Sequence, residues 1–238
     1  MTSTSEVTAL LRERILSGEI SSGARLQQVP LSESLGVSRT PLREALAQLA
    51  NQGLLVYEPN RGYAVRAFSV AEIGAAFEVR ARLEALACSL CAQRGLPGEV
   101  LDQLRACIEE GDRILAKGVL DPADLSPYRR MNVDFHESII RSSGNPFVGD
   151  FIRQCHNVPL ASDRVFVWED YGVIARSHDD HRRILGALEM RDAERADYLM
   201  REHVRFAGFI LLRKLERSQA FEPRLRGASV ERNGLGTG

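Results

Sequence analysis

The chain has 238 residues, of which 44% are hydrophobic and 26% charged, and its formal net charge is −1 at pH 7. This length suits a small domain joined to a medium one, and the near-zero charge means that any DNA binding would need a local basic patch. No stretch approaches the roughly 20 apolar residues of a membrane span, and the N-terminus lacks the order of a signal peptide, so we expect a cytoplasmic protein with no membrane partner.

Three short helices are predicted in the first fifty residues. Apolar residues at helical spacing indicate the first over 5–17, and a polar loop then leads to a second helix at about 31–35. The third helix lies within 37–53, with Ser38 or Thr40 as its N-cap. We expect the apolar face of the third helix to pack on the first two.

A β-hairpin follows the third helix. Residues 54–65 contain two short apolar runs around Glu58-Pro59-Asn60-Arg61-Gly62, a segment with the turn residues typical of a hairpin. Three helices followed by a hairpin with a basic tip are the arrangement of a winged helix-turn-helix. We therefore assign residues 1–66 to a DNA-binding domain of this kind.

The rest of the chain is predicted to be helical, because no further strand is indicated after Ser69. The predicted helical segments are 69–95, 97–118, 122–144, 145–157, about 159–190 and 192–218. We expect residues 67–217 to form an all-α bundle and the polar residues 218–238 to be a disordered tail. The fold class is thus mainly α, a winged helix-turn-helix followed by a helical bundle.

The third helix has one apolar face and one basic face. Its apolar face consists of Leu42, Ala45, Leu46 and Leu49. Arg39, Thr40 and Arg43 point away from this face near the helix N-terminus, where an arginine fork suits guanine in the major groove. In the hairpin, Arg61 lies beside the flexible Gly62, within reach of the DNA backbone or minor groove. The alternative is an ordinary solvated helix face, but the order of the elements favours DNA binding.

The N-terminal sequence resembles the signature of the GntR family of bacterial regulators over residues 8–66. The residues that carry the resemblance are 37–46 (VSRTPLREAL), Leu49, Gly53, Leu54 and the upstream segments 15–20 and 23–26. The resemblance implies a protein that binds double-stranded operator DNA. The residues it assigns to the DNA contacts are Ser38, Arg39, Thr40 and Arg43 in the helix and Arg61 and Gly62 in the wing.

Three histidines on different predicted helices suggest a metal site. His136, His181 and His203 could meet in the centre of a bundle, and three imidazoles with one oxygen donor suit zinc or nickel while leaving positions open for a ligand. Taken singly, each histidine would more often be an ordinary core or surface residue. The pattern therefore needs support from the rest of the domain.

The C-terminal region is similar to the FCD effector domain of the FadR-type GntR subfamily, on the residues Phe135-His136, 143–146, His181 and His203. This resemblance implies that three histidines and an aspartate bind a divalent metal. Asn132 stands where the aspartate is expected, so the ligand set is His136, His181, His203 and the Asn132 amide. Because this set is neutral, the metal would keep its full charge and attract an anion, so we expect a small carboxylate effector.

Arg80 is the expected partner of the effector carboxylate. It stands four residues before Glu84, and the two form either a pair on a helix surface or, as the resemblance implies, a pair whose arginine faces the effector pocket. His156 and His178 are interpreted as surface or helix-end residues.

Two alternatives were weighed against this interpretation. Three histidines could activate water in a metal-dependent hydrolase, but Ile140 interrupts the H-E-x-x-H pattern that His136 and Glu137 begin. A regulator with a metal-free organic effector pocket is the other alternative. The favoured interpretation is a homodimeric transcriptional regulator and not an enzyme, with repression as the expected mode and a roughly palindromic operator.

Overall fold

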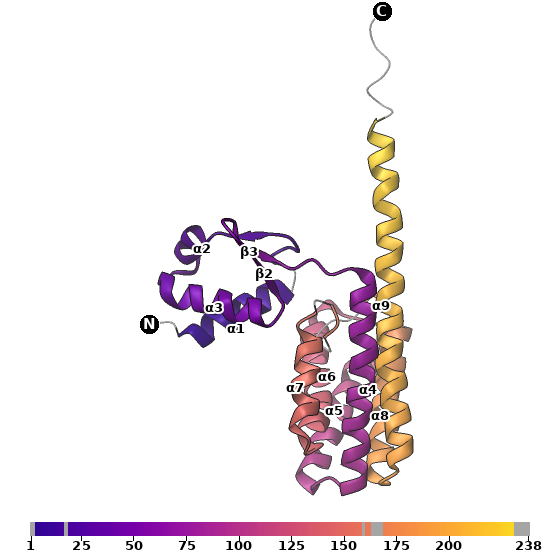
Figure 1. The fold of residues 1–238 in the computed structure, drawn as a ribbon. Coiled ribbons are helices and arrows are strands. Elements are labelled where there is room, and N and C mark those ends of the chain that lie inside the picture. Colours follow the sequence, from indigo (N-terminus) through magenta and orange to yellow (C-terminus); the bar gives the residue numbers. More distant parts are fainter. Residues whose placement is uncertain (1–2, 17–18, 159, 163–168, 231–238) are drawn as a thin grey trace, which may run out of the picture.

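The computed structural model describes residues 3–16, 19–158, 160–162 and 169–230, with the backbone alone over 218–230. Figure 1 shows a small N-terminal unit of helices and strands beside a bundle of longer helices. Each unit has its own hydrophobic core, one drawn from residues 7–65 and the other from residues 73–211. The fold class is mainly α, as the sequence predicted.

The N-terminal unit packs three helices against a small sheet. Its elements are α1 (Thr4–Leu16), β1 (Arg25–Leu26), α2 (Gln28–Leu35), α3 (Arg39–Asn51), β2 (Leu55–Glu58) and β3 (Gly62–Val65). The apolar stripe of α3 is fully buried, because it packs against α1 and the first strand residues of the wing. The strands are antiparallel in the order β1-β3-β2, and Glu58 pairs with Gly62 where the hairpin turns.

Two features of this unit differ from the sequence prediction. The strand β1 was not expected, because it is only two residues long and depends on pairing with the distant residues Tyr63 and Ala64 of β3. The helix α2 begins at Gln28 and not near residue 31, since Pro30 lies in its first turn, where the missing N–H costs little.

The second unit is built from α4 (Val70–Arg94), α5 (Gly98–Leu115), η1 (Pro122–Asp124), α6 (Leu125–Ser142), α7 (Pro146–His156), α8 (Tyr171–Glu189) and α9 (Ala193–Val230). Helix α4 begins at a capping box, in which the Ser69 side chain accepts from the Glu72 N–H and the Glu72 side chain accepts from the Ser69 N–H. Helices α4 and α9 lie side by side along much of the bundle (Figure 1). No helix in the described part of the chain combines the length and apolarity of a membrane span.

The end of the last helix also differs from the prediction. A disordered tail was expected from residue 218, but α9 continues to Val230. The sequence between Gly208 and Pro223 contains no glycine or proline to stop the helix over 218–222, and α9 also continues past Pro223 and Gly227. Residues 231–238, the rest of the predicted tail, lie outside the described residues.

Candidate functional site

Three buried histidines meet in the centre of the bundle. His136 comes from α6, His181 from α8 and His203 from α9, and each is at most 4% exposed. The Nε2 atom of His203 lies 3.2 Å from the Nε2 atoms of both His136 and His181. The structure therefore brings together the three histidines that the sequence singled out.

The positions of these histidines follow from the apolar stripes of their helices. His136 and His181 each replace one apolar residue in the buried face of an amphipathic helix, at the spacing that points the face into the core. The ring of Phe135 stacks on His181, with centroids 4.4 Å apart and planes 27° from parallel. Packing thus holds the imidazoles in place before any ligand is considered.

The cluster has the properties of a metal site. One ligand atom from each of His136, His181 and His203 lies within 4.8 Å of the others. Burial and the neighbouring imidazoles hold the pKa of His181 well below its ordinary value, and burial also lowers the pKa of His203, so both are neutral near pH 7. A neutral imidazole offers one nitrogen lone pair to a metal, and three ring nitrogens this close together fit a divalent metal.

Asn132 and the Arg80–Glu84 pair surround one side of this cluster. Asn132 is buried on α6, one helical turn before His136 and on the same face. The alternative of Arg80 and Glu84 as a pair on a helix surface is wrong, since their exposures are 3% and 1%. Both residues lie on the inner face of α4, which packs against α6, α7, α8 and α9.

Glu84 joins Arg80 to the histidine cluster. Its Oε2 atom lies 2.5 Å from His136 Nδ1, and its other oxygen accepts from Arg80 Nε. Arg80 Nη1 donates to the Ala161 carbonyl at 3.1 Å. Burial opposes the ionisation of Glu84, but the charge of Arg80 and the contact with His136 outweigh it and hold its pKa well below the usual range.

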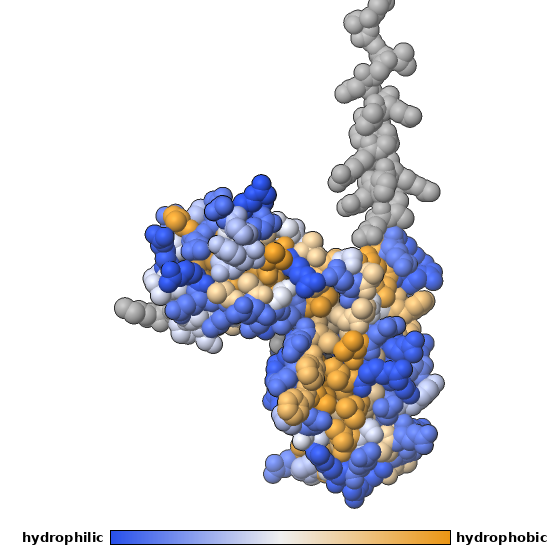
Figure 2. All heavy atoms as spheres, in the orientation of Figure 1, coloured by the Kyte–Doolittle hydropathy of each residue, from blue (hydrophilic) through white to orange (hydrophobic). Residues whose placement is uncertain are grey.

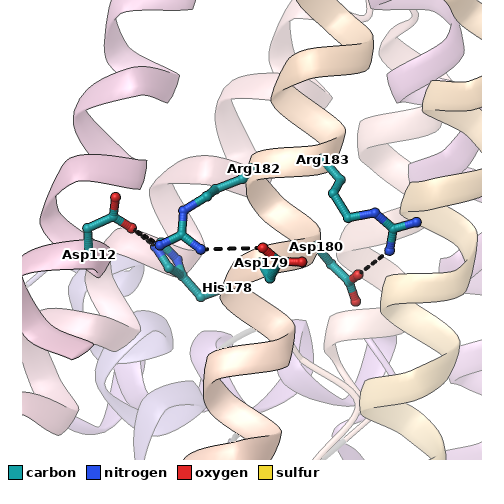
Figure 3. A network of polar contacts seen from close by, with 6 residues as sticks. All are labelled: Asp112, His178, Asp179, Asp180, Arg182 and Arg183. Carbon is teal, nitrogen blue, oxygen red and sulfur yellow. Dashed lines mark hydrogen bonds and ion pairs between the residues drawn. The ribbon is translucent and has the colours of Figure 1, made fainter. Parts of the chain in front are cut away.

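A second carboxylate beside the cluster was missed by the sequence analysis. Asp180 is 4% exposed on α8, and its Oδ2 atom lies 3.8 Å from His203 Nδ1. Its Oδ1 atom accepts from Arg183 at 3.0 Å (Figure 3). The available signal was that Asp180 directly precedes His181, but an acidic residue in a charged helical segment is usually exposed.

The interpretation of His178 as a surface or helix-end residue is wrong. It lies in the middle of α8, is 1% exposed, and its Nε2 atom is 2.7 Å from Asp112 Oδ1 (Figure 3). Burial lowers its pKa, although Asp112 opposes the shift. Gly111 of α5 makes room for the ring, because a Cβ there would lie 2.1 Å from His178 Cε1. His156, by contrast, is the last residue of α7 and is half-buried.

The residues expected to contact DNA are exposed on the N-terminal unit. Ser38 is the N-cap of α3, and Arg39, Thr40 and Arg43 are exposed in its first two turns. Within the described residues, no ion pair joins either arginine to an acid, so both guanidinium groups are available for phosphates or bases.

The wing has an exposed basic tip. The Arg61 side chain is 69% exposed at the hairpin turn, where its Nη1 atom lies 4.0 Å from Glu58. Gly62 follows with a φ of 80°, a conformation that residues with a Cβ rarely adopt, so glycine is needed there to close the turn. The wing thus presents Arg61 from a tightly fixed backbone.

Hydrogen bonds also connect the two units of the chain. Asn157, which follows α7 in the bundle, accepts from Arg12 of α1 at 3.3 Å. Its amide donates to the Gln52 carbonyl at 3.3 Å, and Gln52 is the C-cap of α3. The C-terminal end of α3 is therefore tied to the bundle.

The bundle has an apolar surface on one side. Figure 2 shows this area over α4 and α7. The large exposed apolar side chains of these two helices are Val79, Leu86, Phe147 and Phe151. These side chains form an exposed apolar surface on the bundle.

Comparisons with known proteins agree with both units. Residues 3–65 match the family described as bacterial regulatory proteins, gntR family, and residues 75–206 match the FCD domain. The chain is 27% identical over 208 residues to the HTH-type transcriptional repressor GlaR of Escherichia coli K12, covering 82% of this chain and 89% of that relative. It is 30% identical over 219 residues to an uncharacterized HTH-type transcriptional regulator of Streptomyces ambofaciens, covering 90% and 86%.

A similar fold is found among solved structures. Escherichia coli McbR/YncC has a TM-score of 0.70 at 21% identity, and the match covers 90% of this chain and 98% of that one. At this identity the likeness concerns the fold alone.

Proposed function

The chain belongs to the GntR family of bacterial regulatory proteins and carries an FCD domain, and from this premise we propose that it is a transcriptional repressor controlled by a small carboxylate effector. The effector binds at a metal ion in the helical bundle and changes the affinity for operator DNA. The observation that carries the proposal is the convergence of His136, His181 and His203 beneath an N-terminal unit with an exposed arginine-bearing helix. The family consists of DNA-binding regulators and not of enzymes.

In this proposal residues 1–66 bind the operator. The exposed first turns of α3 enter the major groove, where Arg39, Thr40 and Arg43 contact bases or phosphates. The wing places Arg61 and Gly62 against the backbone or minor groove. Ser38 at the helix N-cap brings the N-terminal N–H groups of α3 close to a phosphate.

Operator recognition uses a homodimer, and residues 67–217 supply its interface. A symmetric dimer reads two half-sites of a roughly palindromic operator. The apolar surface over α4 and α7 supports this arrangement, because a second copy would cover the exposed rings of Phe147 and Phe151.

The metal is zinc or nickel, held by His136, His181 and His203 with Asn132 as the oxygen donor. Imidazole nitrogen is a preferred ligand of both metals. When bound, the metal supplies a positive centre with open coordination positions. The neutral ligands leave this charge uncompensated in the first layer of contacts, so a carboxylate is the effector chemistry that suits the site.

Arg80 is the second proposed contact of the effector. Its guanidinium lies behind His136 and already donates to Glu84 and to the Ala161 carbonyl. A carboxylate that reached Arg80 would compete with these acceptors. Because Ala161 is four residues from Asn157, a change at Arg80 would reach the contacts that Asn157 makes with Arg12 and Gln52. We infer that Asn157 transmits the effector signal to α3.

The metal content of the untagged protein tests this proposal. We expect near-stoichiometric zinc or nickel by elemental analysis, lost from the His181→Ala and His203→Ala variants. A His156→Ala variant is the matched control, since His156 lies at the end of α7 and not in the cluster, and it should keep its metal. Calorimetry with a panel of organic acids should then show binding to the metal-loaded protein. Metal-loaded protein that binds none of these acids would contradict the carboxylate effector.

The metal-free alternative has one observation in its favour, which is the replacement of the expected aspartate by Asn132. A neutral amide binds a hard divalent cation more weakly than a carboxylate does. A protein that is purified without metal, takes up none on titration and still binds its upstream DNA would favour an organic effector held by the histidines and Arg80.

A further inference from the structure

Two buried carboxylates stand directly behind the candidate metal ligands. Glu84 of α4 contacts His136 Nδ1 at 2.5 Å, and Asp180 of α8 lies 3.8 Å from His203 Nδ1. Both acids are at most 4% exposed. Each one faces the nitrogen of its histidine that points away from the cluster.

The contact with Glu84 decides which nitrogen of His136 carries the proton. A carboxylate can only accept, so Nδ1 carries the hydrogen and donates it to Glu84. In the neutral ring, Nε2 is then left with a free lone pair. That lone pair points into the cluster, where His203 Nε2 lies 3.2 Å away.

Asp180 is placed to do the same for His203. Within the described residues, Asp180 Oδ2 and His203 Nδ1 have no hydrogen-bond partner, although both atoms are buried. Buried polar atoms are rarely left unpaired, and these two complementary atoms lie 3.8 Å apart. A small movement would join them and give His203 the same proton arrangement as His136.

Building on the proposed function, we propose that Glu84 and Asp180 are positioning residues of the metal site, which turn Nε2 of His136 and His203 toward the metal. Carboxylates behind metal-bound histidines commonly fix the ring orientation and increase the basicity of the ligand. In this chain the carboxylates of Glu84 on α4 and Asp180 on α8 face the Nδ1 atoms of the two ligand histidines.

A purely structural role for Glu84 would give different results. As an ion pair with Arg80 inside the bundle, Glu84 would stabilise the fold without affecting zinc binding by the folded protein. Two measurements therefore distinguish a positioning role from a purely structural one. They are the zinc affinity of the folded protein and the identity of the His136 nitrogen that carries the proton.

Competition with a chromogenic chelator measures the zinc affinity of each variant. Glu84→Gln keeps an acceptor for Nδ1 but removes the charge, and we expect its zinc affinity to fall about 10- to 100-fold. Asp112→Asn is the matched control, because Asp112 pairs with His178, which is outside the cluster on the same helix as His181. Its zinc affinity should equal that of the unmodified protein. A Glu84→Gln affinity within twofold of the unmodified protein would overturn the proposal.

Glu84→Gln leaves Arg80 buried without its partner and could unfold the bundle, so a second variant is needed. The double variant Arg80→Met with Glu84→Gln removes both charges, and the same fall in zinc affinity is expected. Independently of any variant, long-range proton–nitrogen NMR of the zinc-loaded protein should show Nδ1 of His136 protonated and Nε2 bound to zinc. The reverse assignment would also overturn the proposal.

These outcomes are distinct from failure of the proposed function. If the unmodified protein binds neither zinc nor nickel, the metal site itself is refuted. Two other results are zinc bound through Nδ1 of His136 and a Glu84→Gln variant that keeps the zinc affinity of the unmodified protein. In either case the metal site stands and the positioning role of the carboxylates is refuted.

Discussion

The chemistry of single residues at the histidine cluster depends on burial. In water an imidazole with a pKa near 6.5 would be partly protonated close to neutral pH, and protonated rings cannot donate their lone pairs to a metal. His181 and His203 are buried against each other and near His136, so charging either His181 or His203 is unfavourable. Burial thus keeps His181 and His203 in the neutral form that can bind a metal cation.

The same burial predicts how stability depends on pH. The folded-state pKa values of His178, His181 and His203 are lowered from the ordinary value of 6.5, so below pH 6.5 the unfolded chain binds protons that the folded chain does not. We expect the free energy of unfolding of the EDTA-treated protein to be constant above this pH and to fall below it. Each histidine contributes at most about 1.4 kcal/mol per pH unit.

Urea unfolding between pH 5 and 8 measures this dependence. In a His181→Gln variant one titrating group is gone, so the decline below pH 6.5 should be shallower even if the overall stability is lower. A flat profile for the unmodified protein, or an identical slope in the variant, would show that these histidines do not titrate with folding.

The candidate site was predictable at the residue scale only in part. His136, His181 and His203 each replace an apolar residue in a helical stripe, and this local pattern, with the family resemblance, is visible in the sequence. The roles of Glu84, Asp180 and His178 could not be predicted from the sequence, because each depends on a partner from another helix. Asp112 pairs with His178 across 66 residues of sequence.

At the scale of helices, the bundle depends on close approach at specific positions. Gly111 of α5 faces the ring of His178 on α8, and a Cβ at this position would lie 2.1 Å from Cε1. Replacing a helical glycine by alanine normally stabilises a helix by about 0.5–1 kcal/mol. Here the steric conflict should outweigh that gain, and we expect Gly111→Ala to lower the free energy of unfolding by about 1–3 kcal/mol.

Gly186→Ala on α8 is the matched control for this prediction. No atom lies within 4 Å of the Cβ that it would add, so the helical preference of alanine should act alone and raise stability by about 0.5–1 kcal/mol. Urea denaturation of both variants measures the difference. Equal stabilisation by the two substitutions would mean that α5 and α8 do not approach as closely as described.

The elements that the sequence predicted are those in which apolar residues recur at helical spacing. Helices α3 through α8 carry apolar stripes and breakers in their own residues, so their existence could be inferred locally. The strand β1 could not, because two residues become a strand only by pairing with β3. The end of α9 was also missed, since polar composition alone does not stop a helix that has already formed.

Control of DNA binding by an effector in the bundle requires the two units to communicate. Asn157 is the residue through which the bundle hydrogen-bonds to both α1 and the C-cap of α3. It lies beside the turn whose Ala161 carbonyl accepts from Arg80, and Arg80 contacts Glu84 at the cluster. The histidines are thus linked through Glu84 and Arg80 to the Ala161 carbonyl, four residues after the Asn157 side chain that holds the C-cap of α3.

The most direct test of the central claim is a fluorescence anisotropy titration of the protein's upstream DNA, with and without the organic acids that bind in calorimetry. The account predicts that an acid changes the operator affinity of the metal-loaded protein, and that Asn157→Ala reduces this change. Arg43→Ala should lose about 1–3 kcal/mol of specific affinity, whereas Arg129→Ala, an exposed arginine of the bundle, should not. Unchanged affinity in Arg43→Ala, or an operator affinity that no bound acid alters, would contradict the account.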